Sequence, residues 1–361
     1  MATDMLAVTA PAFTDPSGYE LSKLPRPVIS GEADVMIRVL AASINPVDVK
    51  KAAGAFKLAM PERFPYKIGY DAAGIVEAIG GQVTRFKAGD EVFVRLPEVG
   101  RGSWSEYVVC PESYIAFKPR NLSFTEAASL PLAGVTALQV LRQYQGGLEG
   151  KTVFVPAGLS GTGAYACQLA KNVFRAGKVI TTVSTSKVAK VAELLGEGVV
   201  DQVIDYTKDS PTKVIAPRSV DLLFDTTGQA MQFLSLMVPS TGLIVSISTT
   251  PSSATLQSAS VMQRPDNPHV PLLGRLLLDT MDALRRLRAW RWSVTYMYWF
   301  LKPNGEDLTA LSGFAEEGKL LPLVGTRVSL EDIEKVREAC MLSYRGKGGI
   351  GKTVFEVSPA N

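Results

Sequence analysis

The sequence predicts an α/β protein made of a barrel-like β domain and a doubly wound parallel sheet. Residues 1–125 hold short strand-like runs separated by Gly and Pro, which is typical of an all-β unit. From Ser123 to Phe300, strand and helix patterns alternate, and this alternation indicates a parallel sheet with right-handed crossovers. Residues 351–357 again have the pattern of a strand, which we expect to return to the first domain.

Length and composition suit a two-domain protein of a reducing compartment. The chain has 361 residues, of which 46% are hydrophobic and 20% are charged. Its net charge of +3 is too small to indicate nucleic acid or a membrane as partner, and no apolar run approaches the roughly 18 residues of a spanning helix. The first residues lack the profile of a secretory signal, and three scattered cysteines offer no disulfide framework. We therefore expect a cytoplasmic location.

Three consecutive segments are expected to form the two domains. Residues 1–125 give the first part of the β domain, residues 126–301 give the parallel sheet, and residues 302–361 return to the β domain. The expected strands of the first part cover residues 34–42, 74–79, 91–95, 104–110 and 114–117. The expected strands of the parallel sheet cover residues 152–156, 178–183, 202–204, 221–225, 243–248 and 294–300. Helices are expected from Ser123, with Ser123 or Thr125 as the cap, and over residues 164–171 and 306–317.

A glycine turn follows the first strand of the parallel sheet. Ser160, Gly161, Thr162 and Gly163 lie between residues 152–156 and the helix that follows. The free backbone N–H groups at such a helix start attract an anion, so the turn predicts a phosphate cradle. The alternative is an ordinary turn that joins the strand to the helix and binds nothing.

The end of the second strand predicts which dinucleotide is bound. NAD sites place Asp or Glu there to hold the ribose 2′-hydroxyl. This chain has Ser184-Thr185-Ser186-Lys187 instead, and hydroxyls with a lysine favour a 2′-phosphate. The sequence therefore predicts NADPH, with Lys190 as a substitute should Lys187 be a merely solvated lysine.

Several short motifs, taken together and in this order, resemble one family over nearly the whole chain. They are Ser43-Ile44-Asn45-Pro46-Val47-Asp48, Gly69-Tyr70-Asp71-Ala72-Ala73-Gly74, Lys87-Ala88-Gly89-Asp90, Gly102-Ser103-Trp104-Ser105-Glu106-Tyr107 and Val203-Ile204-Asp205-Tyr206. The chain resembles the zinc-free medium-chain dehydrogenase/reductase superfamily, in its quinone oxidoreductase-like and fungal enoyl reductase branches. The resemblance implies a GroES-like β-barrel domain plus an inserted Rossmann doubly wound parallel sheet. It also implies that a homodimer, if formed, pairs residues 294–300 edge to edge; otherwise the chain is a monomer.

The resemblance implies further site residues. Asn45 and Asp48 would lie at the nicotinamide pocket, Thr136 would face the carboxamide, and Tyr206 would reach the 2′-phosphate. Two strand-end turns and a glycine-rich stretch would complete the cofactor site, with Thr227, Gly228, Ile247, Ser248, Gly348 and Gly349. The alternatives are an Asx turn for Asn45, a threonine bonded to its own helix for Thr136, and an aromatic cap for Tyr206.

Zinc chemistry is not expected. Zinc-dependent members of the family carry Gly-His-Glu where this chain has Gly69-Tyr70-Asp71, and they carry a four-cysteine lobe that is missing near residue 100. The only histidine, His269, lies in a proline-rich loop, and one histidine with three separated cysteines cannot form a zinc site.

Two motifs invite other interpretations. Residues 346–353 satisfy the phosphate-loop pattern G-x-x-x-x-G-K-[ST], but a strand-like run follows where a helix is required, so ATP or GTP binding is rejected. Residues 272–292 carry five arginines among Leu, Met and Trp. A membrane helix or a site for an acidic partner such as an acyl carrier is one interpretation. We expect instead a solvated basic face above an apolar core face.

The leading functional hypothesis is an NADPH-dependent reductase of an activated C=C bond or a quinone, acting by hydride transfer without zinc. One alternative is a trans-acting enoyl reductase of a polyketide synthase pathway, served by an acyl carrier or synthase partner. Another is a non-catalytic NADPH-binding partner or sensor. Asn45 and Tyr70 are the candidate catalytic residues, with Tyr66 as a further donor, and no strongly paired acid stands out. Residues 55–65 and 252–271 are expected to shape the substrate site.

Overall fold

Short apolar runs form the predicted parallel sheet in the computed structural model, which describes residues 4–358. All six expected strands belong to it, in the order β11-β10-β9-β12-β13-β14, and every neighbouring pair is parallel. This is the order of a Rossmann sheet. The strands are β9 (Thr152–Val155), β10 (Lys178–Val183), β11 (Gln202–Asp205), β12 (Leu222–Asp225), β13 (Leu243–Ser246) and β14 (Thr295–Tyr298).

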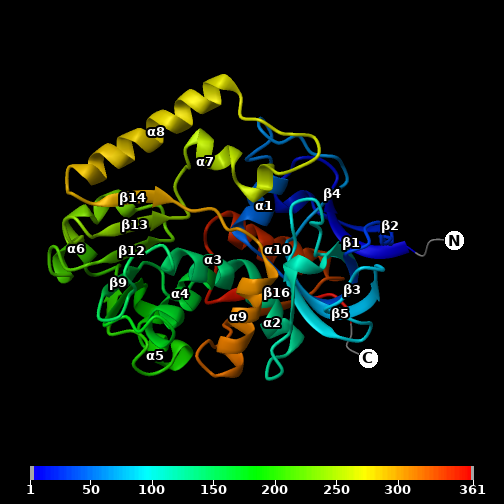
Figure 1. The fold of residues 1–361 in the computed structure, drawn as a ribbon, viewed down its shortest axis with the longest axis horizontal. Coiled ribbons are helices and arrows are strands. Elements are labelled where there is room, and N and C mark those ends of the chain that lie inside the picture. Colours follow the sequence, from blue (N-terminus) through cyan, green and yellow to red (C-terminus); the bar gives the residue numbers. More distant parts are fainter. Residues whose placement is uncertain (1–3, 359–361) are drawn as a thin grey trace.

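Helices cover both faces of this sheet (Figure 1), as buried parallel strands require. Strands β12 and β13 are buried along their whole length. The helices of this part of the chain are α3 (Pro131–Leu141), α4 (Gly161–Asn172), α5 (Lys190–Leu195), α6 (Pro211–Val214), α7 (Ser253–Gln257) and α8 (Leu272–Trp290), whereas α9 (Gly305–Glu316) packs against α3 and against strands of the other part.

The other part of the molecule holds two sheets. A seven-stranded sheet has the order β15-β16-β3-β5-β6-β8 with β7 on β3, and a three-stranded sheet has the order β2-β1-β4. The strands are β1 (Asp4–Ala10), β2 (Glu20–Pro25), β3 (Asp34–Ser43), β4 (Tyr66–Lys67), β5 (Asp71–Ile79), β6 (Glu91–Arg95), β7 (Tyr107–Pro111), β8 (Ile115–Phe117), β15 (Val324–Ser329) and β16 (Lys352–Glu356). Helices α1 (Pro46–Ala52), α2 (Phe124–Ser129) and α10 (Ile333–Tyr344) accompany them. Strands β1, β2, β4 and β15 and helix α10 are additions to the predicted elements.

The helical segment after Ser123 differs from the single helix expected. Ser123 is the cap, because its Oγ accepts a hydrogen bond from the Glu126 N–H at 3.3 Å while Glu126 Oε2 accepts the Ser123 N–H at 2.8 Å. The segment then divides into α2 and α3 at Pro131, which lacks an N–H group and starts a new helix.

Helix α8 forms over the expected residues, but its apolar face is not core. Figure 1 shows α8 along the outer edge of the molecule, beyond β14 and α7. Only Asp282 and Ala289 are buried in it. Leu273, for example, is 81% exposed. The prediction of an apolar core face was therefore wrong for most of its leucines, because neighbouring elements cover only a narrow inner side that includes Leu278 and Ala289.

The C-terminal strand returns to the β domain as predicted. Strand β16 pairs antiparallel with β3, and Phe355 enters the core between the two. The Phe355 ring lies 5.0 Å from the Trp104 ring in an edge-to-face contact. Trp104 was expected to start a strand; instead it is fully buried, and its Nε1 donates to the Ser43 carbonyl at 3.2 Å.

Truncation of Phe355 tests whether the C-terminal tail completes this core. We expect Phe355→Ala to lower the free energy of unfolding by about 3–5 kcal/mol, because it removes a fully buried aromatic ring. Urea denaturation followed by circular dichroism measures the change. The matched control is Glu356→Ala on the same strand, which is exposed and should change stability by less than about 0.5 kcal/mol. Equal effects of the two substitutions would contradict a core role for the tail.

Candidate active site

The predicted phosphate cradle lies where β9 turns into α4. Ser160 caps the helix, and its Oγ accepts the Gly163 N–H at 3.1 Å. The first N–H groups of a helix have no partner within it. Ser160 takes the N–H of Gly163, and its bridge with Gly351 turns the Gly161 N–H towards the glycine-rich loop, so the N–H of Thr162 is left to face an anion at the helix start.

Steric contacts explain two glycines of this turn, whose pattern is G-x-x-G-x-G rather than G-x-G-x-x-G. A Cβ on Gly158 would lie 2.1 Å from Thr181 Oγ1. A Cβ on Gly163 would lie 2.3 Å from the Ala157 carbonyl oxygen. Both positions are therefore restricted to glycine by close packing of the turn against β10 and against itself.

The residues predicted for the 2′-phosphate follow the carboxyl ends of β10 and β11. These strands are neighbours, so Thr185, Lys187 and Tyr206 lie at one corner of the sheet. Ser184 is half-buried at the same corner, and Tyr206 is 57% exposed. The Lys187 Nζ donates to the Gly349 carbonyl at 3.1 Å. The corner therefore presents a cation, hydroxyls and an exposed phenol together.

The turns after β12 and β13 complete the same edge of the sheet. Asp225 Oδ1 accepts the N–H groups of Thr227 at 3.2 Å and Gly228 at 2.8 Å, which fixes the turn. Ile247 donates its N–H to the Asp225 carbonyl at 3.1 Å. Ser248 Oγ donates to the Thr226 carbonyl of that same turn at 2.6 Å. The structure thus brings these predicted residues together.

The glycine-rich loop before β16 lies beside the cradle. Gly348 and Gly349 are exposed in it, and the Gly351 N–H donates to the Leu159 carbonyl at 2.8 Å. A strand follows this loop, as predicted, so it lacks the helix that a nucleotide phosphate loop requires. Its lysine, Lys352, points away from the loop into the protein, where its Nζ donates to the Ile44 carbonyl at 2.8 Å.

Asp71 is the centre of a buried polar cluster next to the cradle. Its carboxylate accepts hydrogen bonds from Ser43 Oγ at 3.1 Å, Asn45 Nδ2 at 2.9 Å and the Leu132 N–H at 3.0 Å. The Lys352 ammonium lies 3.7 Å away and also donates to Asn45 Oδ1. Both ends of the Asn45 amide are therefore held, so its orientation is fixed.

Burial shifts the acid–base behaviour of this cluster. It raises the pKa of Asp71 and lowers the pKa of Lys352, although their attraction opposes both changes. Burial, with the nearby Asp71 charge, also raises the pKa of Asp48 to about 8. Asp48 Oδ2 accepts the Asn45 N–H at 2.7 Å, in agreement with its expected role in holding the loop.

The remaining catalytic candidates are engaged inside the protein. Tyr70 is fully buried and donates its hydroxyl to Glu98 Oε2 at 2.6 Å. Burial raises the pKa of Tyr70 and of Tyr66, so both phenols keep their protons at neutral pH. Thr136 Oγ1 donates to the Leu132 carbonyl at 2.6 Å, which is the backbone interaction considered as its alternative.

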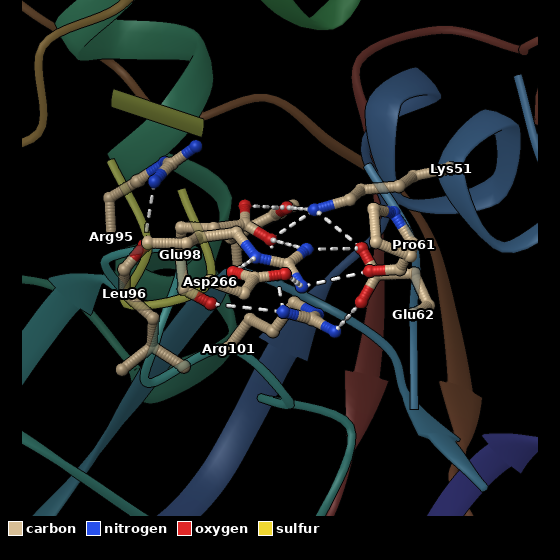
Figure 2. A network of polar contacts seen from close by, with 10 residues as sticks. Lys51, Pro61, Glu62, Arg95, Leu96, Glu98, Arg101 and Asp266 are labelled. Carbon is tan, nitrogen blue, oxygen red and sulfur yellow. Dashed lines mark hydrogen bonds and ion pairs between the residues drawn. The ribbon is translucent and has the colours of Figure 1, made fainter. Parts of the chain in front are cut away.

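A network of buried ion pairs was missed by the sequence analysis (Figure 2). The side chains of Glu62 and Glu98 are 1% exposed, and both pair with Lys51 and Arg101. Arg264 Nη1 adds a contact of 2.8 Å to Glu62. The expectation that no acid is strongly paired was therefore wrong. The partners Glu62 and Arg264 are 202 residues apart, and no local pattern connects them.

Arg264 makes this network a link between the two parts of the molecule. It lies between β13 and α8 of the parallel-sheet part, whereas the other four residues belong to the β domain. Burial lowers the pKa of Lys51, while the negative charges of Glu98 and Glu62 favour its protonated form. The ion pair between Glu62 and Arg264 thus joins the two segments expected to shape the substrate site, residues 55–65 and 252–271.

Two family descriptions match the chain. Residues 31–120 match the family described as alcohol dehydrogenase GroES-like domain. Residues 199–354 match the family described as zinc-binding dehydrogenase. Together they cover the β domain and much of the parallel-sheet part.

Several curated proteins are similar in sequence. The mitochondrial reticulon-4-interacting protein 1 of Caenorhabditis elegans is 32% identical over 92% of this chain and 91% of its own length. The 2-methylene-furan-3-one reductase of Solanum lycopersicum is 38% identical over 65% of this chain and 61% of its own length. The chloroplastic NADPH-dependent alkenal/one oxidoreductase of Arabidopsis thaliana is 37% identical over 60% of this chain and 56% of its own length. The match thus spans less than two thirds of the two plant enzymes.

A solved structure shares the whole architecture. The quinone oxidoreductase from Coxiella burnetii superposes with a TM-score of 0.77 over 99% of this chain and 100% of its own, at 28% identity. The β domain is therefore GroES-like and the parallel sheet is a Rossmann domain, as the sequence resemblance implied.

The raised pKa of Asp48 predicts a pH-dependent stability. The folded chain holds a proton at this site up to about pH 8, whereas an unfolded Asp releases it near pH 4, so stability is lost as the pH rises towards 8. Asp48→Asn mimics the neutral acid. Between pH 6 and pH 8 we expect the wild type to lose on the order of 1–2 kcal/mol more unfolding free energy than the variant. Urea denaturation at each pH measures this, and parallel profiles would refute it.

Proposed function

The chain belongs to the medium-chain dehydrogenase/reductase superfamily, in its quinone oxidoreductase-like branch, and from this premise we propose an NADPH-dependent, zinc-free reductase of an activated C=C bond or a quinone. The observation that carries the proposal is the convergence of the predicted cofactor residues at one edge of the Rossmann sheet. Ligands of such sheets bind at this edge.

The residues present fit NADPH. The N–H of Thr162 at the start of α4 would hold the pyrophosphate, and Lys187 with Tyr206 would hold the 2′-phosphate. The glycines of the turn are required by its close packing against the protein, which fixes the path of the backbone at the helix start. When bound, NADPH supplies the hydride. The name of the Arabidopsis thaliana relative, an NADPH-dependent oxidoreductase, agrees with this choice.

An enone, a quinone or a related conjugated acceptor suits the chemistry of the site. Reduction of such an acceptor places negative charge on its oxygen, and a positioned donor stabilises that charge. Asn45 is proposed as this donor, because Lys352 and Asp71 fix its buried amide and Asp71 takes only one of the two N–H groups of Nδ2; the acceptor would have to reach the other. The name of the tomato relative describes a reductase of a conjugated ketone.

Solvent is proposed as the proton source. Tyr66 and Tyr70 are buried and their pKa values are raised, so neither phenol releases a proton readily. Tyr70 was a candidate catalyst, but its hydroxyl is directed to Glu98. We assign it a positioning role in the ion-pair network.

A catalytic zinc does not fit the side chains at this site. Tyr70 replaces the histidine of zinc-dependent relatives, and a neutral buried phenol is a poor ligand. Across residues 4–358, no three His, Cys, Asp or Glu side chains are grouped as metal ligands would be. The substrate must then be activated by its own conjugation.

An assay with a panel of acceptors tests the proposal. We expect NADPH oxidation with enones or quinones, and undiminished turnover in the presence of EDTA. Turnover restricted to enoyl thioesters on an acyl carrier would favour the trans-acting enoyl reductase instead. Tight NADPH binding without turnover of any acceptor would overturn both and leave a non-catalytic sensor.

Asn45→Ala should lower kcat by about tenfold or more with little change in NADPH affinity.

Removal of the Lys187 charge tests the choice of NADPH. We expect Lys187→Ala to raise the KM for NADPH about tenfold and to leave the KM for NADH within a factor of two, because only NADPH carries the 2′-phosphate. Steady-state kinetics with both cofactors measure this. Lys178→Ala, at the start of β10 and so at the end of that strand away from Lys187, is the matched control. Equal losses for both cofactors would contradict the assignment, and a loss specific to Lys190→Ala would move it to that residue.

A further inference from the structure

Helix α8 presents an unusually apolar outer face. Its exposed side consists of six leucines and a tryptophan, each more than half exposed: Leu272, Leu273, Leu276, Leu277, Leu284, Leu287 and Trp290. At about 100° per residue these side chains span an arc of about 140°, and the helix is about 28 Å long. A continuous stripe of this size marks a docking surface rather than a solvated face.

The charges of α8 are all arranged around this stripe. Asp279 is engaged by α7, since it accepts the Ser253 N–H at 2.7 Å. Asp282 is buried and bonded to Arg286 at 2.6 Å. The guanidinium groups of Arg288 and Arg291 make no hydrogen bond or ion pair with any residue between 4 and 358. The flanks of the stripe therefore carry more positive than negative charge, and, among the residues that the structure describes, Asp279 is the one acid of this helix that is not paired with a cation.

A shallow pocket lies at the carboxyl end of the same helix. It has a volume of about 270 Å³, and its lining includes Arg288, Arg291, Trp292 and Ser235. Two guanidinium groups beside a hydroxyl and an indole suit a phosphate ester at the border between water and an apolar phase. The apolar stripe, the arginines beside it and the pocket thus adjoin one another along α8 and its carboxyl end.

We propose that α8 docks this protein on an anionic phospholipid membrane, lying in the plane of the interface with its leucines among the acyl chains. Amphipathic helices with Leu and Trp on one face and basic residues beside them bind such surfaces. None of the described helices is long and apolar enough to cross a membrane. The contact is therefore peripheral, and it contradicts the expectation that no membrane partner exists.

A second copy of the chain is a poorer occupant of the stripe. Antiparallel pairing of two α8 helices would place Arg288 and Arg291 of one copy opposite residues 271–275 of the other, which include no acid. The acids that could balance these charges, Asp279 and Asp282, are already engaged on the inner side. An anionic lipid surface supplies the missing negative charge and a dimer does not.

Vesicle cosedimentation tests the proposal with the full-length protein. We expect at least tenfold stronger partitioning to vesicles of 30% phosphatidylserine in phosphatidylcholine than to pure phosphatidylcholine, and weaker binding in high salt. The triple substitution Leu276→Gln, Leu277→Gln, Leu284→Gln should lower partitioning at least tenfold. Arg288→Gln with Arg291→Gln should remove the preference for phosphatidylserine. Trp290 fluorescence should shift to shorter wavelength with vesicles only when the leucines are present.

The controls separate this result from misfolding and from self-association. Leu321→Gln with Leu342→Gln changes exposed leucines away from α8 and should leave partitioning unchanged. Circular dichroism and reduction of a soluble acceptor should be unchanged in all variants. Absence of vesicle binding by the wild type, or equal binding by the triple variant, would overturn the proposal. A dimer in sedimentation velocity that the leucine substitutions abolish, without vesicle binding, would assign the stripe to a second copy.

Discussion

The buried carboxylate of Asp71 is the constraint on which the site depends. A buried charge is tolerated only when it is paired and hydrogen-bonded. The partners of Asp71 come from the end of β3, the start of α1, the start of α3 and β16, so four separate segments must meet at one point. Lys352 in turn packs against the cradle, since a Cβ on Gly161 would lie 2.7 Å from its Cδ. The cofactor cradle and the proposed oxyanion donor, Asn45, are thus positioned by the same ion pair.

Two adjacent residues connect this cluster to the second buried network. Asp71 faces Lys352 and Asn45, whereas Tyr70 donates to Glu98. Glu98 and Glu62 then reach Arg264 through contacts that bridge the two domains. Removing one partner from such a network would leave an uncompensated charge, at a cost of about 3–5 kcal/mol. The relative position of the domains beside the cleft is therefore fixed by directional charge pairs rather than by apolar packing alone.

The parts of this arrangement that were predictable from the sequence are those with a local signal. Apolar runs predicted the strands of the Rossmann sheet, and the rule that ligands bind at carboxyl ends predicted that Thr227 and Ser248 would lie together. The pairing of Glu62 with Arg264 had no such signal, because charged residues in loops have the same pattern whether they are solvated or buried. The leucines of α8 show that burial is equally hard to predict for apolar residues. Periodicity predicts that a helix has an apolar face, but only the tertiary structure decides whether that face is covered.

The inner side of α8 gives the proposed membrane contact a consequence for the reaction. Leu278 packs against a small cluster that includes Met60 and Met262, which lie in the two segments expected to shape the substrate site. Arg275 holds the start of the helix through the Val270 carbonyl at 2.8 Å. The helix and the substrate segments are therefore packed together. A helix lying in the lipid interface would keep these segments at the apolar phase, where hydrophobic enones and quinones concentrate. Binding the membrane and recruiting an apolar acceptor would then be two effects of the same packing.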